Sequence, residues 1–162
     1  MPRRPLLLLS SCLLLSCLLL LAACNRGNIK RVSAPAASLQ QVSVASDGHW
    51  KVELRLQNYS TMSMVYDTID LQVTVDGQPA GALTSKPAFS IGPSFADVVT
   101  LDLAPTPAAR MAAANALAGN GMLGYTLKGK IAVTPLDEKP RSFDIDMHST
   151  LSPAPGLTGV LR

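Results

Sequence analysis

The stretch Tyr125-Thr-Leu-Lys-Gly-Lys-Ile-Ala-Val133, followed by Phe143-Asp-Ile-Asp-Met-His148, decides the fold. In both segments apolar and polar side chains alternate with period two, which is the pattern of a half-buried strand. A turn centred on Asp137 brings the segments together in a register that suits both faces. Charges of opposite sign pair on one face and apolar side chains pair on the other: Lys130 with Asp144, Lys128 with Asp146, Ile131 with Phe143 and Leu127 with Met147. Because both faces agree on one register, the two segments are predicted to form an antiparallel hairpin.

Three further segments show the same alternation, residues 50–57, 69–75 and 99–103. Residues 39–44 and 88–91 are weaker strand candidates. Each strong segment has one apolar and one polar face, so a single sheet would leave its apolar face in water. We therefore expect an all-β fold in which two antiparallel sheets pack face to face.

One segment, residues 106–118, has a helical composition. It is rich in alanine, Thr106 can cap its start, and Pro107 suits the first helical turn. Gly119 can end the helix in the left-handed conformation. Met111 and Leu117 can share one side. The segment is predicted to be a short helix that crosses between the sheets at one end of the sandwich.

The N-terminus has the layout of a secretory signal. Arg3 and Arg4 precede the leucine-rich run 6–21, and small residues follow it. The tetrad Leu21-Ala-Ala-Cys24 resembles the bacterial lipobox, which places the cleavage between Ala23 and Cys24 and a lipid on Cys24. An uncleaved transmembrane helix is the alternative reading of the same run. The position of Cys24 at the end of the run favours the lipoprotein.

These patterns divide the chain into a signal peptide (1–23), a lipid-anchored flexible tether (24–37), a β-sandwich (38–151) and a tail rich in Pro and Gly (152–162). Asn25, in place of the Asp that commonly retains Gram-negative lipoproteins in the inner membrane, indicates the periplasmic face of the outer membrane. The basic residues of the tether either touch anionic headgroups or are simply solvated. The tail either lies along the sandwich, binds another envelope component or is disordered.

The composition excludes several functions. The chain has 14 Lys and Arg against 11 Asp and Glu, and two of the arginines fall in the signal, so the remaining chain is almost neutral. No strongly basic surface for nucleic acid remains. All three cysteines lie at or before position 24. The exported domain therefore has no thiol for a disulfide, a zinc site or nucleophilic catalysis.

The pattern resembles the WHy domain of the late embryogenesis abundant (LEA) type 2 proteins. The resemblance rests on three motifs: Leu54-Arg-Leu-Gln-Asn58-Tyr-Ser, Ile69-Asp-Leu-Gln-Val-Thr-Val-Asp-Gly77, and Gly124-Tyr125-Thr-Leu-Lys-Gly129-Lys-Ile-Ala-Val133. The family often has Asn-Pro-Asn where this chain has Asn58-Tyr59-Ser60. The resemblance implies a fibronectin- or immunoglobulin-like sandwich of about seven strands, with the helix before the penultimate strand. It also implies a link to desiccation and stress, with no enzymatic activity and no cofactor.

The residues that could carry chemistry have structural explanations. Gly119-Asn-Gly-Met-Leu-Gly124 matches a dinucleotide fingerprint literally, but a helix precedes it and a strand follows, the reverse of the required order. The carboxylates lack the spacing of a calcium loop, and two histidines without cysteine make a poor metal set. No catalytic, cofactor-binding or metal-binding residue is predicted. An enzyme would need a pocket converging on Asp67, Asp70 or His49.

The stretch containing Met62, Met64 and Tyr66 lies in the long connection after Asn58 and has two interpretations. Methionine packs adaptably, so these residues could contact a partner or could cap the core. The function expected from all these patterns is non-enzymatic protection or stabilisation of the envelope under water loss or other stress. Its partners would be the membrane, through the lipid on Cys24, and envelope proteins or headgroups. The alternative is an accessory lipoprotein that docks on one envelope assembly partner.

Overall fold

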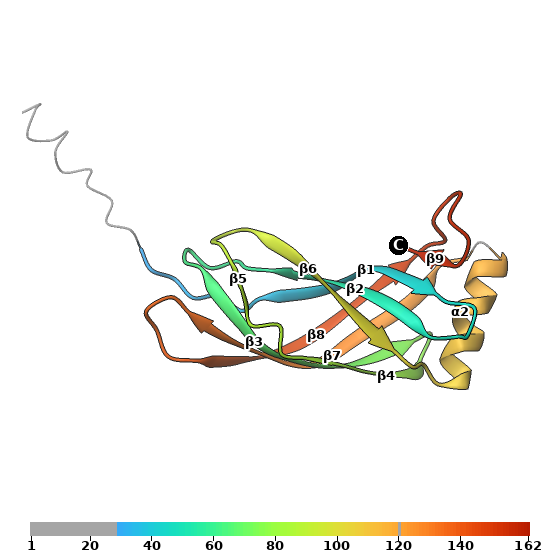
Figure 1. The fold of residues 1–162 in the computed structure, drawn as a ribbon, viewed down its shortest axis with the longest axis horizontal. Coiled ribbons are helices and arrows are strands. Elements are labelled where there is room, and N and C mark those ends of the chain that lie inside the picture. Colours follow the sequence, from blue (N-terminus) through green and yellow to red (C-terminus); the bar gives the residue numbers. More distant parts are fainter. Residues whose placement is uncertain (1–28, 120) are drawn as a thin grey trace, which may run out of the picture.

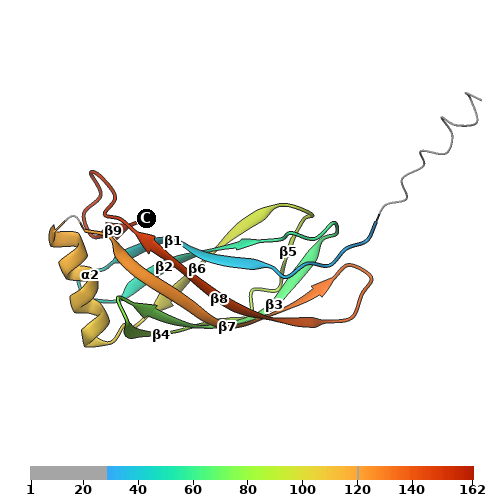
Figure 2. The ribbon, with the colours of Figure 1, turned by 180° about the vertical axis from the view of Figure 1, so that it is seen from behind.

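The computed structural model describes residues 29–119 and 121–162, which fold as an elongated sandwich of two antiparallel sheets with a helix at one end (Figures 1 and 2). The first sheet has the strand order β6–β2–β1–β9. The second has the order β4–β3–β7–β8, with β5 also paired to β3. The strands are β1 (Ala36–Val44), β2 (Trp50–Gln57), β3 (Met64–Val75), β4 (Gln78–Ser85), β5 (Phe89–Ile91), β6 (Ala96–Leu103), β7 (Leu123–Pro135), β8 (Arg141–Leu151) and β9 (Val160–Leu161). The predicted fold class is confirmed: seven of these strands have eight residues or more, and β5 and β9 are short additions.

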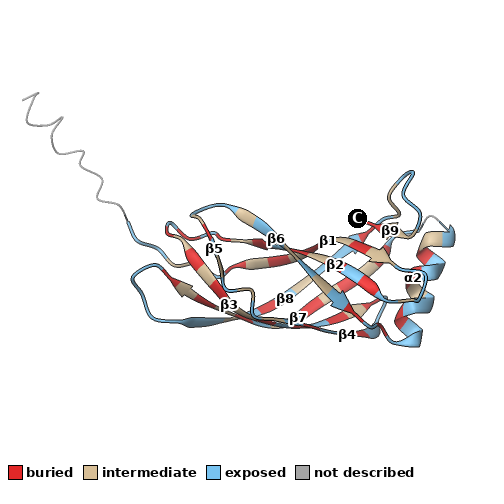
Figure 3. Ribbon diagram, in the orientation of Figure 1, coloured by how far each residue is buried: buried red, intermediate tan, exposed pale blue. Residues whose placement is uncertain are grey.

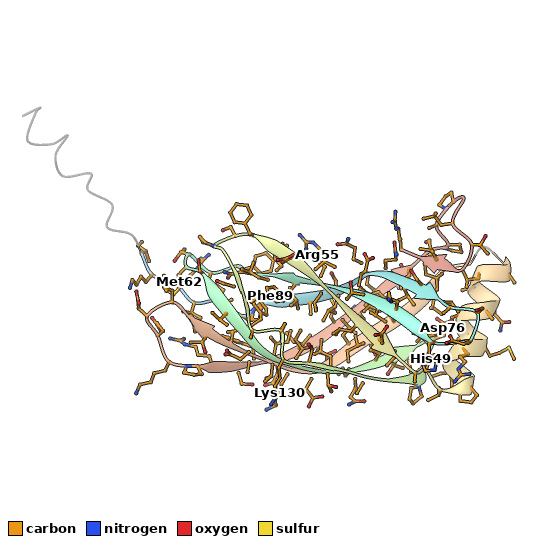
Figure 4. All side chains as sticks on the ribbon, in the orientation of Figure 1. His49, Arg55, Met62, Asp76, Phe89 and Lys130 are labelled. Atoms are coloured by element: carbon orange, nitrogen blue, oxygen red, sulfur yellow. The ribbon has the colours of Figure 1, made fainter. Side chains whose placement is uncertain are left out.

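The hairpin that decided the fold forms in the predicted register. In β7 and β8, Lys130 faces Asp144 and Ile131 faces Phe143. The Lys130 Nζ–Asp144 Oδ1 distance is 3.6 Å, and the Lys128 Nζ–Asp146 Oδ2 distance is 3.2 Å. Lys130 projects from the outer face of its sheet (Figure 4). Charges on the outside and apolar pairs on the inside therefore specify one register.

The core lies between the sheets, where the alternate apolar side chains of both meet (Figure 3). Trp50 and Tyr125 are 1% and 4% exposed, as their position in the alternation predicted. At a bulge in β1 between Leu39 and Gln41, the Leu39 N–H donates to the Tyr125 hydroxyl over 3.2 Å. Tyr125 therefore joins the two sheets through a hydrogen bond as well as through packing.

The helix, α2 (Pro107–Gly119), closes one end of the sandwich between β6 and β7, as predicted (Figure 1). The Ala109 N–H donates to Thr106 Oγ1 over 3.3 Å, so Thr106 is the N-cap. Gly119 is the last helical residue and is not left-handed, contrary to the prediction. The terminating hydrogen bond comes later, from the Gly121 N–H to the Ala116 carbonyl.

Met111 and Leu117 do not share one side of the helix, contrary to the prediction, and neither belongs to its buried face. The buried face consists of Ala109, Ala113 and Ala116, while Met111 is 64% exposed and Leu117 is only partly buried. Alanines let the helix backbone lie close to the end of the sandwich. The methionine is therefore on the solvent side.

At two strands, β3 and β4, the prediction fails because bulges interrupt the alternation. The strand predicted to begin at Ile69 begins at Met64, and a register shift between Tyr66 and Thr68 moves the buried set from even to odd positions. The strand β4 was not predicted at all. Its buried residues Ala80 and Leu83 are three apart, because the pairing shifts between Val73 and Thr74. A search for period two does not detect a strand with such spacing.

The C-terminal tail is ordered and lies along the sandwich, one of the alternatives that the sequence left open. Two hydrogen bonds join the Ser152 and Arg162 backbones, and β9 adds to the edge of β1. Leu161 is fully buried. The tail thus connects the last strand of one sheet with the edge of the other.

Candidate functional site

The predicted lipidation site, Cys24, and the preceding Ala23 lie outside the described residues, so the lipoprotein interpretation stays a prediction. The described chain begins at Ile29, at the end of the sandwich opposite α2 (Figure 1). We call the end at which the chain enters the tether end and the other the helix end. In the described ranges there is no helix with the length and apolar character needed to span a bilayer.

Asn58 organises the loops of the tether end. Its side chain is fully buried, and its Nδ2 donates to the Met62, Ile91 and Gly92 carbonyls over 2.9, 3.0 and 3.0 Å. Its Oδ1 accepts a 2.8 Å hydrogen bond from the Ser60 N–H. The Asn58 N–H donates to the Phe95 carbonyl over 2.9 Å. One amide side chain therefore fixes the loop after β2 against the loop between β5 and β6.

Residues 29–33 are held against the loop after β2. The Ser33 N–H donates to Ser60 Oγ over 2.9 Å, and the Arg31 N–H donates to Thr61 Oγ1 over 2.8 Å. The Thr61 hydroxyl donates to the Ile29 carbonyl over 2.7 Å. The tether is therefore shorter than the predicted 24–37, because residues 29–35 lie along the domain and β1 begins at Ala36.

The methionine stretch after Asn58 lies inside the sandwich. Met62, Met64 and Tyr66 are 8%, 0% and 0% exposed, so core packing, not partner contact, is their role in this structure. Figure 4 shows Met62 and Phe89 in the half of the molecule nearer the tether end. The Tyr66 ring stacks on that of Phe89 at a centroid distance of 6.1 Å. The Tyr66 hydroxyl is buried without a hydrogen-bond partner, and burial raises the pKa of this phenol above its usual range.

Four of the carboxylates considered for chemistry have partners within the fold. Asp144 and Asp146 pair with lysines, and Asp67 Oδ2 accepts a 2.7 Å hydrogen bond from Thr134 Oγ1. Asp76, in the turn between β3 and β4, accepts from the Gly124 N–H over 2.8 Å. Among residues 29–119 and 121–162, no three His, Cys, Asp or Glu side chains gather as metal ligands.

The histidine and the aspartates of the enzyme alternative are not brought together. His49 precedes β2 of the first sheet and lies near α2 (Figure 4), whereas Asp67 and Asp70 belong to β3 of the second sheet. The glycines of the literal dinucleotide motif end α2 and begin β7, the order that argued against nucleotide binding. The last of these glycines, Gly124, lies in β7 and donates its N–H to Asp76 in the turn between β3 and β4, so it has a structural role.

Except for Val98 in β6, the exposed large apolar side chains of the described residues lie at the two ends. At the tether end four of them form what we call the tether-end surface: Ile29, Tyr59, Phe95 and Leu136, which are 80%, 55%, 69% and 60% exposed. Three more form the helix-end surface: Met111, Met122 and Leu157, which are 64%, 70% and 47% exposed. Shallow hollows flank α2, one of about 590 Å³ beside Met111 and Met122 and one of about 910 Å³ beside Leu157.

Sequence reasoning did not identify either surface. The residues of the tether-end surface come from four separate loops and have no periodic spacing, so only the folded chain brings them together. The one signal available was an aromatic residue inside a polar turn, Tyr59 between Asn58 and Ser60. A turn of this kind does not need an aromatic side chain for its geometry.

Comparison with known proteins gives one family match and a likeness to a solved structure. A family model described as late embryogenesis abundant protein, LEA_2, matches residues 53–147, from β2 to β8. A solved structure described as a protein from Archaeoglobus fulgidus aligns with 76% of this chain and 98% of its own, with 11% identity and a TM-score of 0.45. No curated protein matches the sequence significantly.

The structure explains two residues of the motifs that resemble the LEA type 2 family, Gly129 and Asn58. Gly129, five positions after Gly124, has φ of 154°, and a Cβ there would overlap the Asp70 carbonyl oxygen of the neighbouring β3. Asn58 supplies the buried amide of the turn, and the Ser60 N–H and hydroxyl complete its hydrogen bonds. Because the family model covers more than half of the sequence and both sheets, this chain belongs to the late embryogenesis abundant LEA type 2 family.

Proposed function

We propose that this protein is a lipoprotein of the outer membrane whose LEA type 2 domain protects or stabilises envelope components during water loss or other stress, without catalysis. The family match over residues 53–147 carries the proposal, because LEA type 2 proteins are associated with stress. The Leu21-Ala-Ala-Cys24 tetrad and the leucine-rich run before it support the anchor. Asn25 supports export to the outer membrane.

The mechanism in this proposal is physical. The outer faces of the sheets carry charged side chains of both signs, such as the Lys128–Asp146 and Lys130–Asp144 pairs, which are well exposed. Such a surface stays hydrated and resists association. A tether of a few residues keeps this surface beside the membrane, where it interacts weakly with drying proteins and headgroups.

Protection is tested by drying a labile enzyme with this protein and measuring the activity recovered on rehydration. The test protein is the mature chain with Cys24→Ser, since a shorter form starting in β1 would lose the Ser33–Ser60 contacts. An equal mass of an unrelated β-sandwich is the control. Recovery clearly above the control is expected. Recovery equal to the control would contradict generic protection.

The anchor is tested separately, by incorporation of labelled palmitate in a Gram-negative host and by fractionation of the two membranes. Incorporation is expected in the wild type and not in Cys24→Ala. We expect the wild type in the outer membrane and Asn25→Asp in the inner membrane. An unlabelled wild-type chain would overturn the anchor but not the family assignment.

The helix-end surface favours a second candidate function, docking on one envelope assembly partner. Met111 and Met122 line the same hollow beside α2 and are adaptable apolar anchors. Deletion of residues 152–162 is not a clean test, because Leu161 is buried and β9 pairs with β1. Met111→Ser with Met122→Ser leaves the core intact. Docking predicts a stoichiometric envelope complex that this double variant loses and that Tyr59→Ser retains.

A further inference from the structure

Four loops far apart in the sequence form the tether-end surface as one unit. The Asn58 N–H donates to the Phe95 carbonyl over 2.9 Å, and the Leu136 N–H donates to the Ser63 carbonyl over 3.0 Å. The Thr61 hydroxyl holds the Ile29 carbonyl over 2.7 Å. The loops that carry these exposed apolar side chains are thus joined to one another by hydrogen bonds. Exposed apolar side chains held in one region mark an interaction surface rather than scattered exposure.

The surroundings of this surface are cationic. Lys30, Arg31, Lys139 and Arg141 are exposed there beside the acidic pair Asp137 and Glu138. Lys30 lies 3.9 Å from Asp137, and Arg141 lies 2.6 Å from Glu138. Among the described residues these are the ion pairs of that end. Arg31 and Lys139 add two cations, which the exposed Asp97, two residues after Phe95, only partly offsets. Exposed apolar and aromatic side chains together with an excess of cations at the same end match the interface of a membrane with anionic lipids.

The length of the tether identifies the occupant of this surface. Four residues, 25–28, separate the predicted lipid-bearing Cys24 from Ile29, and the five Cα–Cα steps from Cys24 to Ile29 span about 18 Å at full extension. The 13 residues of β7 run most of the length of the sandwich, about 40 Å. With the helix end on the membrane, Ile29 would lie too far away for Cys24 to reach the lipid. The tether end is therefore the end within reach.

We propose that the tether-end surface inserts Tyr59, Phe95 and Leu136 into the interface of the membrane that holds Cys24, so that the sandwich stands on its tether end. The inference rests on the lipid anchor of the proposed function. Tyr rings favour the headgroup level, while Phe and Leu favour the acyl boundary. The anchor makes this contact intramolecular, so a weak surface is sufficient to orient the domain.

The position of each end is measured with an environment-sensitive dye on a single introduced cysteine. Residues 29–162 contain no Cys, and the sulfur of a lipidated Cys24 would not react with the dye. Ser94→Cys marks the tether end and Ala114→Cys marks the helix end; both positions are exposed and small. The full lipidated protein is reconstituted in vesicles of phosphatidylethanolamine and phosphatidylglycerol. We expect blue-shifted emission, shielded from aqueous quencher, at position 94 and aqueous emission at position 114.

Matched triple variants separate the surface from the anchor. Tyr59→Ser, Phe95→Ser and Leu136→Ser together are expected to abolish the shielding at position 94 while the protein stays in the vesicles. The control triple, Met111→Ser, Met122→Ser and Leu157→Ser, removes as many exposed apolar side chains and is expected to leave the shielding unchanged. Aqueous emission at position 94 in the lipidated wild type would overturn the proposal. An equal loss in both triples would overturn it as well.

Failure of the anchor is distinguishable from failure of the surface. Palmitate incorporation is measured on the same preparation, and an unlipidated chain would remove the anchor alone. The mature chain with Cys24→Ser is then floated with the same vesicles. The tether-end triple is expected to lower its partitioning about 100-fold relative to the wild-type surface, since each inserted side chain contributes roughly a factor of five. Equal partitioning of the tether-end triple and the control triple would contradict insertion by the tether-end surface.

Discussion

The two ends of this sandwich are closed by different kinds of interaction. At the tether end, loops are joined by hydrogen bonds to Asn58 and Ser60, the two fully buried polar side chains of the described residues. At the helix end, α2 packs three alanines onto the sheets, and a single cap, Thr106, fixes its start. Buried polar groups are costly unless every partner is in place, whereas small apolar contacts tolerate adjustment.

Exposed apolar area does not by itself identify a membrane contact. Both ends expose large apolar side chains. What separates them is the place where the chain enters, together with the short reach of residues 24–28. The tether end combines apolar side chains, excess cations and a rigid hydrogen-bonded base. The helix end combines apolar side chains with hollows beside α2.

The largest expected effect is that of Asn58→Ala, which breaks the base of the tether end. The change leaves three carbonyls and the Ser60 N–H without their partner. The free energy of unfolding is expected to fall by about 3 to 5 kcal/mol, since each unsatisfied buried group costs about 1 to 3 kcal/mol and water recovers part of this. Urea denaturation measures it. Asn115→Ala, on the exposed side of α2, is the control and should change stability by less than about 0.5 kcal/mol.

Thr106→Ala tests the helix end in the same way and is expected to have a smaller effect. The Ala109 N–H loses its acceptor at the start of α2, and caps of this kind contribute about 1 kcal/mol. Thr106 Oγ1 also donates to the Pro79 carbonyl over 2.6 Å, which adds to the loss. The same urea titration applies. A loss as large as that of Asn58→Ala would remove the distinction between the ends.

Tyr66→Phe is expected to stabilise the protein by about 1 kcal/mol, because it removes a buried hydroxyl that has no partner. The effect should grow at alkaline pH. Burial raises the pKa of the folded phenol, so above about pH 10 the unfolded chain loses a proton that the folded chain retains. The wild type therefore loses stability as the pH rises through that range, and Tyr66→Phe loses less. Tyr59→Phe, at an exposed position, should follow the wild type.

The smallest expected effect lies midway between the ends, at the Lys130–Asp144 pair. Both side chains are highly exposed, so a double-mutant cycle with alanine should give a coupling below about 1 kcal/mol, reduced further by salt. The pair serves to specify register rather than stability. A coupling of several kcal/mol would contradict this. It would show that the stability of the middle of the sandwich depends on an ion pair as strongly as that of the tether end depends on Asn58.

The sequence predicted the parts of the fold in which alternation is uninterrupted. The β7–β8 hairpin has eleven paired positions without a shift, and its register was predicted pair by pair. Alternation failed at bulges. The register shift after Tyr66 concealed the first residues of β3 from the period-two pattern. The shift at Val73 concealed β4 in the same way. A bulge inserts one residue, so the buried set changes parity and period two no longer marks it.

The candidate site was harder to predict for a different reason. Met62, Met64 and Tyr66 were visible in the sequence as an apolar stretch, and they are core residues. Tyr59, Phe95 and Leu136 are single apolar residues in polar loops. Their proximity depends on hydrogen bonds between loops, such as Asn58 to Phe95, that no local pattern encodes. A surface assembled from loops is therefore the part of a sandwich that sequence periodicity describes least.

Neutron reflectometry of the lipidated protein on a supported bilayer tests the claim that the domain stands on its tether end. A standing sandwich gives a protein layer of about 40 Å or more in direct contact with the headgroups, as the length of β7 requires. A sandwich lying flat gives a layer of about 25 Å, the thickness of two packed sheets with their side chains. The thick layer is the result that the structure predicts. A thin layer, or a thick one separated from the headgroups by water, would contradict the claim.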